Sequence, residues 1–214
     1  MMSTNFVARG AFIVLEGCDR CGKTTQSKLL LQKLQSKKIK AELINFPDRT
    51  TLIGQLIDKY LTSEKECDDR AIHLLFSANR WEKNRVIQAK LLSGVTLIVD
   101  RYAFSGVAYT SAKGYDFEWC KSPDVGLPKP DLVLFLEMSA ESASRRNEYG
   151  EERYEHLYFQ KAVREVYRKF EGPSWVNVKA NEKVEEISNE ITNIVLETLK
   201  RARNTPLESL WTVP

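Results

Sequence analysis

The sequence predicts a doubly wound α/β fold, in which helices cover both faces of a parallel sheet of about five strands. Short apolar runs alternate along the chain with longer segments whose apolar residues recur at helical spacing. Strands separated by helices need crossover connections, and crossovers produce parallel sheets. The first apolar run also ends in a glycine-rich loop that opens a helix, an arrangement typical of this fold class.

The first half of the chain predicts two strands and three helical segments. Residues 11–15 are an apolar run that predicts the first strand, and residues 24–37 carry leucines on one helical face. Residues 41–46 predict the second strand, which a proline ends. Residues 52–61 show helical spacing, and residues 68–92 form one long helical pattern.

The second half continues the same alternation. A stretch rich in Pro and Gly at 122–130 predicts a loop inside a domain. The other expected elements are strands at 95–99, 131–136 and 175–178, and helices that include 151–169 and 183–203. Ligands bind outside the carboxyl ends of the strands in such sheets, so the residues that follow each apolar run are the candidates for chemistry.

Composition excludes several classes of protein. The 214 residues suit one large domain, and 43% hydrophobic with 29% charged residues excludes disorder, collagen and coiled coil as descriptions of the whole chain. A net charge of +3 is too small to argue for nucleic-acid binding. No uncharged apolar run reaches the ~18 residues that span a bilayer. We therefore expect neither a nucleic-acid nor a membrane partner.

Cysteine content and the N-terminus favour a cytoplasmic location. Residues 1–9 resemble neither a secretory signal nor a transit peptide, and four cysteines are too few for a disulfide framework. Cys18 and Cys21 form a C-x-x-C pair, but zinc needs two further ligands and the sequence has no second such pair. Two free thiols on a loop are the favoured interpretation.

The loop from Gly17 to Thr24 has the pattern G-x-x-x-x-G-K-[ST] between a predicted strand and a predicted helix. The glycines let backbone N–H groups point at a phosphate, and the helix N-terminus adds a positive dipole. Lys23 supplies a point charge for the β and γ phosphates, and the Thr24 hydroxyl can bind Mg²⁺. The pattern indicates a nucleoside triphosphate site; a glycine-rich turn without a ligand is the alternative.

Loops of this kind occur in GTPases, ATP-driven motors and kinases of small molecules. The N-K-x-D pattern that reads guanine is absent, and the chain is short for a motor. Asp100 ends the third predicted strand and suits an anchor for Mg²⁺ and its waters, while Arg101 beside it can neutralise charge during transfer. A surface salt bridge at Asp100 is the alternative interpretation.

Two further arginines suggest a second, acceptor ligand. Arg49 follows the turn after the second strand, where its forked guanidinium suits a phosphate monoester, although a lone arginine is more often solvated. Phe76 and Arg80 share a helix face, which suits a flat base that needs both stacking and hydrogen bonds. A core Phe beside an exposed Arg is the alternative.

Together these segments resemble one family. The sequences GCDRCGKTT, FPDR, LLFSANRW and VDRYAFSGVAYT occur in one order, and the chain resembles eukaryotic-type thymidylate kinases over residues 10–200. The resemblance implies a P-loop NTPase-type fold with a short lid near 143–153, within a single nucleoside-monophosphate-kinase-like domain, 1–214. It implies the reaction ATP + dTMP → ADP + dTDP with Mg²⁺, as part of dTTP synthesis. It also implies a homodimer.

The resemblance also implies roles for individual residues. The dTMP site would comprise Asp19 on the 3′-hydroxyl, Arg49 on the phosphate, Phe76 on thymine, Arg80 on its O4, Tyr109 under the deoxyribose, and Phe46, Arg101, Ser105, Gly106, Tyr154 and Gln160. The ATP site would comprise Gly17, Cys18, Asp19, Arg20, Cys21, Gly22, Lys23, Thr24, Thr25, Arg146, Ala180, Asn181 and Glu182. The catalytic residues would be Arg20, Lys23, Arg101 and Asp19, with Thr24 and Asp100 at the metal.

Members of this family carry the catalytic arginine either in the P-loop or in the lid. Arg20 lies in the P-loop, and the expected lid tip, residues 147–152, contains no Lys or Arg. We therefore assign the transition-state charge to Arg20. Arg146 either covers the adenine or ends a solvated helix.

Two rival functions remain open on the sequence alone. A deoxynucleoside kinase shares the fold class but must deprotonate a neutral hydroxyl, and would not need Arg49 at the acceptor. A nucleotide-gated binding protein would switch shape on ATP without turnover.

The two P-loop cysteines raise a separate hypothesis. Oxidation of Cys18 and Cys21 to a disulfide would distort the P-loop and inactivate the enzyme. Two buried, inert thiols are the favoured interpretation.

Overall fold

The computed structural model describes residues 8–144 and 152–211. Its strands are β1 (Phe12–Glu16), β2 (Ala41–Asn45), β3 (Thr96–Asp100), β4 (Leu132–Glu137) and β5 (Trp175–Lys179). Its helices are α1 (Lys23–Ser36), α2 (Leu52–Leu61), α3 (Asp69–Trp81), α4 (Asn84–Leu92), α5 (Ala103–Ser111), α6 (Phe117–Lys121), the 3₁₀ turn η1 (Ser122–Asp124), α7 (Ala140–Ser144), α8 (Leu157–Tyr167) and α9 (Val184–Ala202).

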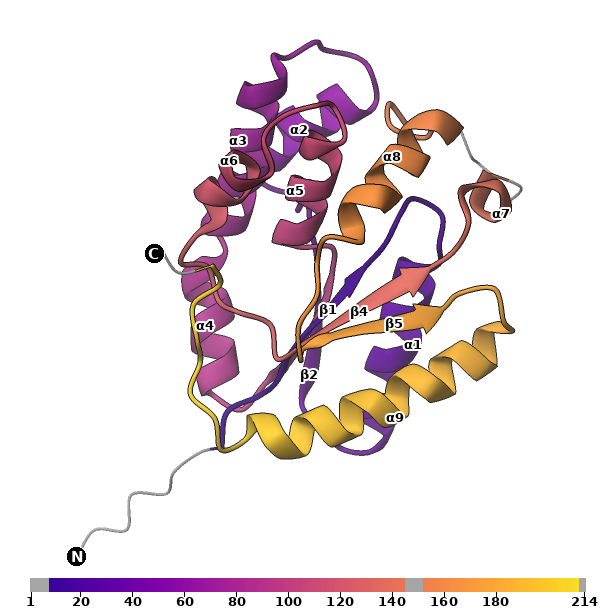
Figure 1. The fold of residues 1–214 in the computed structure, drawn as a ribbon. Helices are drawn as coiled ribbons and strands as arrows, with labels where there is room; N and C mark the ends of the chain where they lie inside the picture. Colours follow the sequence, from indigo (N-terminus) through magenta and orange to yellow (C-terminus); the bar gives the residue numbers. More distant parts are fainter. Residues whose placement is uncertain (1–7, 145–151, 212–214) are drawn as a thin grey trace, which may run out of the picture.

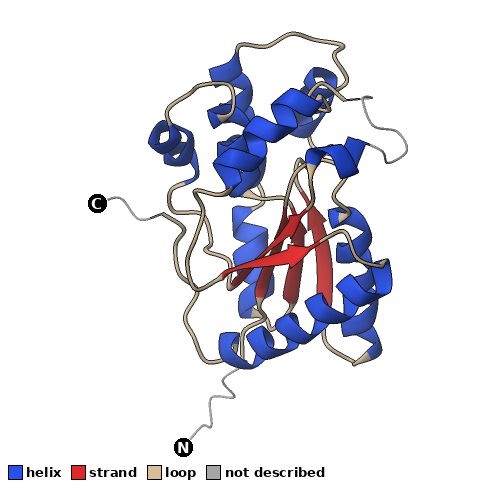
Figure 2. Ribbon diagram, turned by 45° about the vertical axis from the view of Figure 1, so that its right-hand side comes forward, coloured by secondary structure: helices blue, strands red, loops and turns tan. Residues whose placement is uncertain are grey.

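The five strands form one parallel sheet in the order β2-β3-β1-β4-β5. The central strand β1 pairs with β3 through Ile13 and Ile98, and with β4 through Ile13 and Leu132. Figures 1 and 2 show helices on both sides of this sheet, as the sequence predicts for strands joined by crossovers. The doubly wound arrangement predicted from the sequence is confirmed.

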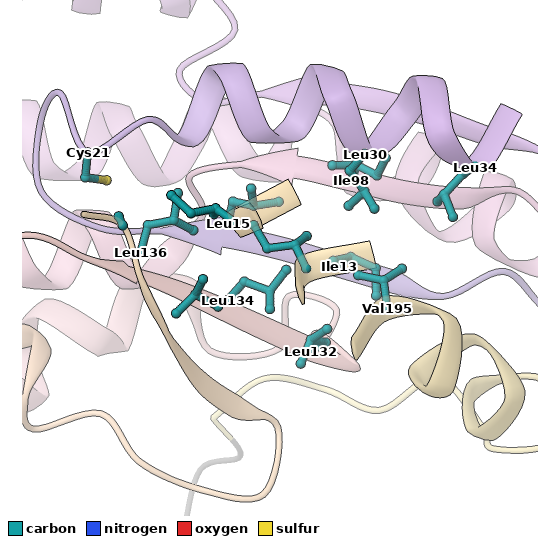
Figure 3. Close-up of a cluster of buried hydrophobic side chains, with 14 of the residues drawn as sticks. Ile13, Leu15, Cys21, Leu30, Leu34, Ile98, Leu132, Leu134, Leu136 and Val195 are labelled. Carbon is teal, nitrogen blue, oxygen red and sulfur yellow. The ribbon is translucent and has the colours of Figure 1, made fainter. Parts of the chain in front are cut away.

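Alternate residues of β1 enter two different cores. Ile13 and Leu15 pack with α1 and α9, through residues such as Leu30 and Val195 (Figure 3). Phe12 and Val14 face a second cluster, to which α4, α5 and α8 contribute. Because both faces are covered, every residue of β1 is buried, which explains its uninterrupted apolar run.

The long helical pattern at 68–92 is wrong in one respect, because two helices replace the single one. The α3 helix ends at Trp81 and α4 begins at Asn84, with Glu82 and Lys83 between them. The buried positions keep helical spacing across this break, at Ser77, Arg80, Ile87 and Leu91, so the periodicity carries no sign of it. The Trp81 indole donates to the Pro123 carbonyl at 2.7 Å, which anchors the end of α3.

The bounds of other elements differ less from those that the sequence predicts. The helix expected at 151–169 begins only at Leu157 and ends at Tyr167. Residues 152–154 form a bend and a turn, and the Arg153 N–H donates to the Leu61 carbonyl at the end of α2. The loop expected at 122–130 contains the 3₁₀ turn η1. Within the described ranges, no helix combines the length and apolar character needed to cross a bilayer.

Candidate active site

An open cleft of about 1150 Å³ lies at the carboxyl ends of the strands. Its lining comes from the P-loop (residues 17–24), the β2–α2 loop, α3, α5 and the segment 152–155. These are the places where the sequence predicts chemistry, so the topology brings most of the predicted residues together. Predicted residues on its wall are Asp19, Arg20, Gly22, Lys23, Thr24, Thr25, Phe46, Arg49, Phe76, Arg80, Asp100, Arg101, Ser105, Gly106, Tyr109 and Tyr154.

The P-loop curls around the Lys23 ammonium, which is buried and donates to the Cys18 carbonyl at 2.6 Å. Gly17 has a φ of +148°, and a Cβ there would lie 2.7 Å from Cys21 Sγ and 2.8 Å from the Leu136 carbonyl oxygen. Gly22, with a φ of 98°, turns the chain into α1. Only glycine fits at position 17, which explains why the motif begins with this residue.

The loop thiols are buried and free. Burial, aided by the neighbouring Cys21, raises the pKa of Cys18 to about 12, so Cys18 is a protonated thiol at neutral pH. This environment favours the inert-thiol interpretation. The described residues contain no cluster of His, Cys, Asp and Glu able to hold a metal by itself.

Thr24 and Asp100 meet at the end of β3. The Thr24 hydroxyl donates to Asp100 Oδ2 at 2.6 Å, and the Asp100 side chain is buried. A hydroxyl beside a carboxylate offers the oxygen donors that Mg²⁺ prefers, and Mg²⁺ commonly keeps waters and substrate phosphates as its other ligands. The pair therefore fits Mg²⁺, and the burial of Asp100 contradicts the surface salt bridge considered above.

Arg101 occupies the left-handed region, with a φ of 67°, directly after β3. Its guanidinium donates to the Gly17 carbonyl at 3.0 Å and to Ser105 Oγ at 3.1 Å, and it forms an ion pair with Asp19. Gln160 donates to the same Asp19 carboxylate at 2.6 Å and accepts from its backbone N–H at 2.9 Å. Arg101 and Asp19 are thus held against the mouth of the P-loop.

Arg20 contacts a carboxylate just after the expected lid, and Arg49 contacts one near the lid's end. Arg20, with a φ of 60°, donates from Nε to Glu155 at 2.7 Å. Arg49 lies 2.6 Å from Glu152 and 2.6 Å from Asp58. Each guanidinium sits where a forked anion can bind, and here a carboxylate takes that place.

The predicted base site brings Phe76, Arg80 and Gly106 together. Phe76 is half-buried on the cleft wall, whereas Arg80 is 2% exposed and paired with Asp124, so the exposed-arginine alternative is wrong. A Cβ on Gly106 would lie 2.8 Å from an Arg80 guanidinium nitrogen. The glycine therefore makes room for the arginine.

Aromatic rings line the neighbouring wall. Tyr109 has a buried hydroxyl with no hydrogen-bond partner among the described residues, and its ring lies 5.4 Å from the Arg101 guanidinium carbon. The ring centroids of Tyr154 and Tyr109 lie 5.4 Å apart. Lys113 donates to the Tyr154 hydroxyl at 3.0 Å. Phe46 also lines the cleft, and its ring centroid lies 5.9 Å from that of Tyr102. An orphaned buried hydroxyl in a cleft suits a polar ligand.

Some predicted residues do not join this cleft. Ala180, Asn181 and Glu182 follow β5, where the Ala180 N–H donates to the Glu137 carbonyl at 2.9 Å, and none of the three lines the described cleft. Arg146 and residues 147–151 of the expected lid tip at 147–152 lie outside the described residues.

Sequence reasoning missed the carboxylates that support the arginines. Glu16 ends β1, Asp124 lies in η1, and both are fully buried. Burial raises the pKa of Glu16, against hydrogen bonding from Ser105 and the charge of Arg101, which lower it. A carboxylate at the end of an otherwise apolar run was a usable signal for Glu16. Asp124 had no such signal inside a loop.

Comparisons with known proteins agree with one another. Residues 15–191 match the family model described as Thymidylate kinase. Thymidylate kinase from Arabidopsis thaliana is 50% identical over 95% of this chain and 78% of that protein, and the one from Homo sapiens is 47% identical over 95% and 98%. A solved structure of thymidylate kinase from Candida albicans has a TM-score of 0.87 and 39% identity, covering 95% of this chain and 99% of that one.

Proposed function

Because the chain belongs to the thymidylate kinase family and transfers the γ-phosphoryl group of ATP to dTMP, we propose how the residues of its cleft divide that work. The observation that carries the division is the position of two anion-binding groups on different elements of one cleft, Lys23 in the P-loop and Arg49 after β2. The first suits the donor and the second the acceptor. The two rival functions raised by the sequence are not favoured by these relatives.

The donor half binds ATP through the P-loop. The backbone N–H groups, Lys23 and the N-terminus of α1 hold the phosphates, and Thr24 with Asp100 would hold Mg²⁺, which neutralises phosphate charge when bound. Arg20 exchanges Glu155 for the transferring phosphoryl group. Its forked donor then meets the charge that spreads over the equatorial oxygens during transfer.

The acceptor half binds dTMP. Arg49 releases Glu152 and takes the monophosphate, Asp19 accepts from the 3′-hydroxyl, and Phe76 and Arg80 read the base. We assign Tyr109, whose buried hydroxyl has no partner among the described residues, to the deoxyribose. The remaining contacts to dTMP are Phe46, Arg101, Ser105, Gly106, Tyr154 and Gln160.

The reaction itself needs little covalent help from the protein. An oxygen of the dTMP phosphate attacks the γ phosphorus, and the bond to the β–γ bridging oxygen breaks, so that ADP leaves. That oxygen is already anionic, so no general base is required and alignment with charge neutralisation suffices. Arg20, Lys23 and Arg101 supply the positive field, and Asp19 aligns Arg101 and the sugar.

We also propose the remaining features of the chain. Residues 1–214 form one nucleoside-monophosphate-kinase-like domain, whose lid at about 143–153 excludes water. Arg146 and residues 180–182 complete the adenine site. The exposed leucines Leu52 and Leu56 on α2, and Leu74 on α3, suit a homodimer, and the four free cysteines suit the cytoplasm.

Turnover assays test the assignment directly. The protein with ATP, Mg²⁺ and dTMP should form dTDP, and thymidine in place of dTMP should give no product. Phosphorylation of thymidine would favour the deoxynucleoside kinase, and no turnover with either would favour the binding protein. A panel of monophosphates that includes dUMP would measure how strictly the base site selects thymine.

A further inference from the structure

Glu16 is a carboxylate at the end of β1, one residue before the P-loop, that the reaction described above does not use. Its side chain has an exposed fraction of 0%. A carboxylate at such a depth is costly unless hydrogen-bond donors surround it. The structure supplies those donors from two other elements, α8 and the start of α5.

The donors are arranged around both carboxylate oxygens. Oε1 accepts from the backbone N–H groups of Tyr102 at 2.8 Å and Ser105 at 3.2 Å. Oε2 accepts from Ser105 Oγ at 2.6 Å and from the Tyr167 hydroxyl at 2.9 Å. The N-terminus of α5 has no side-chain cap of its own, so Glu16 caps this helix from the neighbouring strand.

The same contacts lead to Arg101. The Ser105 hydroxyl that donates to Glu16 accepts from the Arg101 guanidinium at 3.1 Å. The Arg101 backbone N–H donates at 3.0 Å to the carbonyl of Leu15, the residue before Glu16. This hydrogen bond holds the left-handed backbone conformation of Arg101. The end of β1 therefore fixes both the backbone and one side-chain contact of Arg101.

We propose that Glu16 is a positioning residue for phosphoryl transfer, which sets the orientation of the Arg101 guanidinium through Ser105 and the first turn of α5. This inference rests on the role proposed above for Arg101. A guanidinium held in its working orientation needs no reorganisation as charge develops on the phosphoryl group. A displacement of about 1 Å can cost on the order of 10²-fold in rate.

The first test substitutes Glu16→Gln, which keeps the shape and removes the charge. We expect kcat to fall by roughly 10–100-fold, while the KM values for ATP and dTMP change by less than about threefold. Asp131→Asn is the matched control, because Asp131 accepts from the Phe12 N–H at 2.8 Å at the opposite end of the same strand. It should lower the melting temperature and leave kcat unchanged.

Ser105→Ala provides a second variant if Glu16→Gln does not fold, since it cuts the link to Arg101 and leaves the other donors to Glu16 in place. We expect kcat to fall with little change in melting temperature. A rise in KM for dTMP alone would restrict Ser105 to the pyrimidine and overturn the proposal.

A double-mutant cycle with Arg101→Lys separates positioning from general support of the fold. If Glu16 acts through Arg101, Glu16→Gln should lower kcat far less in the Arg101→Lys background than in the wild-type background. An equal fold-decrease in kcat on Glu16→Gln substitution in the two backgrounds would overturn the proposal. So would a folded Glu16→Gln protein with wild-type kcat. Wild-type turnover of dTMP, measured first, tests the proposed function independently.

Discussion

The guanidinium of Arg80, in the wall of the cleft, and the carboxylate of Asp124 form a buried two-pronged ion pair. Arg80 Nε lies 2.9 Å from Asp124 Oδ1, and its terminal nitrogen lies 2.6 Å from Oδ2. The side chains are 2% and 0% exposed. The pair therefore fixes the plane of Arg80 at the proposed base site before any nucleotide binds.

Asp124→Asn should destabilise the protein strongly. The substitution leaves a buried guanidinium without its counter-charge, which typically costs about 3–5 kcal/mol. We expect a corresponding fall in the free energy of unfolding measured in urea. The KM for dTMP should rise as well, since Arg80 loses its orientation.

Glu208→Gln is the control for charge removal as such. Glu208 pairs with Lys129 across 2.5 Å, but the two side chains are 59% and 46% exposed. An exposed pair contributes only about 0–1 kcal/mol. Similar losses in the two variants would show that burial of the Arg80–Asp124 pair has no special weight.

Gly106→Ala tests the contact from the other side of Arg80. The added Cβ would lie 2.8 Å from one guanidinium nitrogen and 3.4 Å from the other terminal nitrogen, and Asp124 prevents the arginine from yielding freely. We expect the KM for dTMP to rise while the KM for ATP stays constant. Steady-state kinetics with each substrate varied in turn measure both. An unchanged KM for dTMP would place the base away from Arg80.

The sequence predicted the sheet and most of the cleft because both depend on local patterns. The apolar runs that became β1, β3 and β4 are buried on both faces, and the P-loop, Asp100 and Arg101 follow strand ends that the topology brings to one edge. Such placement follows from chain order and the rules of parallel sheets.

What the sequence could not predict depends on tertiary contacts between distant segments. The pairing of Arg80 with Asp124 joins residues 44 positions apart, and that of Arg20 with Glu155 joins residues 135 apart. The break between α3 and α4 falls in phase with the buried face, so periodicity alone could not reveal it. The intrinsic helix or strand preference of a short segment predicts neither the long-range ion pairs nor the helix break.

Thr24→Ala and Asp100→Asn should each weaken the dependence of activity on Mg²⁺. Both remove an oxygen donor from the proposed metal site. Loss of such a group commonly costs about 10–100-fold in metal affinity. The Mg²⁺ concentration at half-maximal rate should therefore rise, and Thr24→Ser, which keeps the hydroxyl, should remain close to wild type. An unchanged Mg²⁺ midpoint in Thr24→Ala would remove Thr24 from the metal site.

Arg20→Ala should lower turnover far more than it raises the KM for dTMP. An arginine that stabilises the transferring phosphoryl group acts in the transition state, and its loss costs about 10³-fold or more in kcat. Single-turnover and steady-state assays separate the two effects. Arg168→Ala is the control, because Arg168 pairs with Glu165 on an exposed face of the protein. A pure defect in dTMP binding would contradict the catalytic role.

His73 should make stability fall in acid. The ring is fully buried, with Nδ1 2.8 Å from the Thr110 hydroxyl and Nε2 3.0 Å from the Cys120 carbonyl, so the neutral tautomer carries its proton on Nε2. Burial lowers its pKa from 6.5, and the charge of Arg80 lowers it further, while Asp124 acts in the opposite direction. Below pH 6.5 the unfolded chain therefore binds a proton that the folded chain refuses.

The stabilisation is complete above that pH and is lost as the pH falls, at about 1.4 kcal/mol per pH unit while only the unfolded state is protonated. His73→Asn cannot take up this proton. The difference in unfolding free energy between wild type and this variant should therefore be largest near pH 8 and shrink toward pH 5. His156→Asn, which alters the exposed second histidine, is the matched control variant. A constant difference between wild type and His73→Asn would show that His73 titrates alike in the folded and unfolded states.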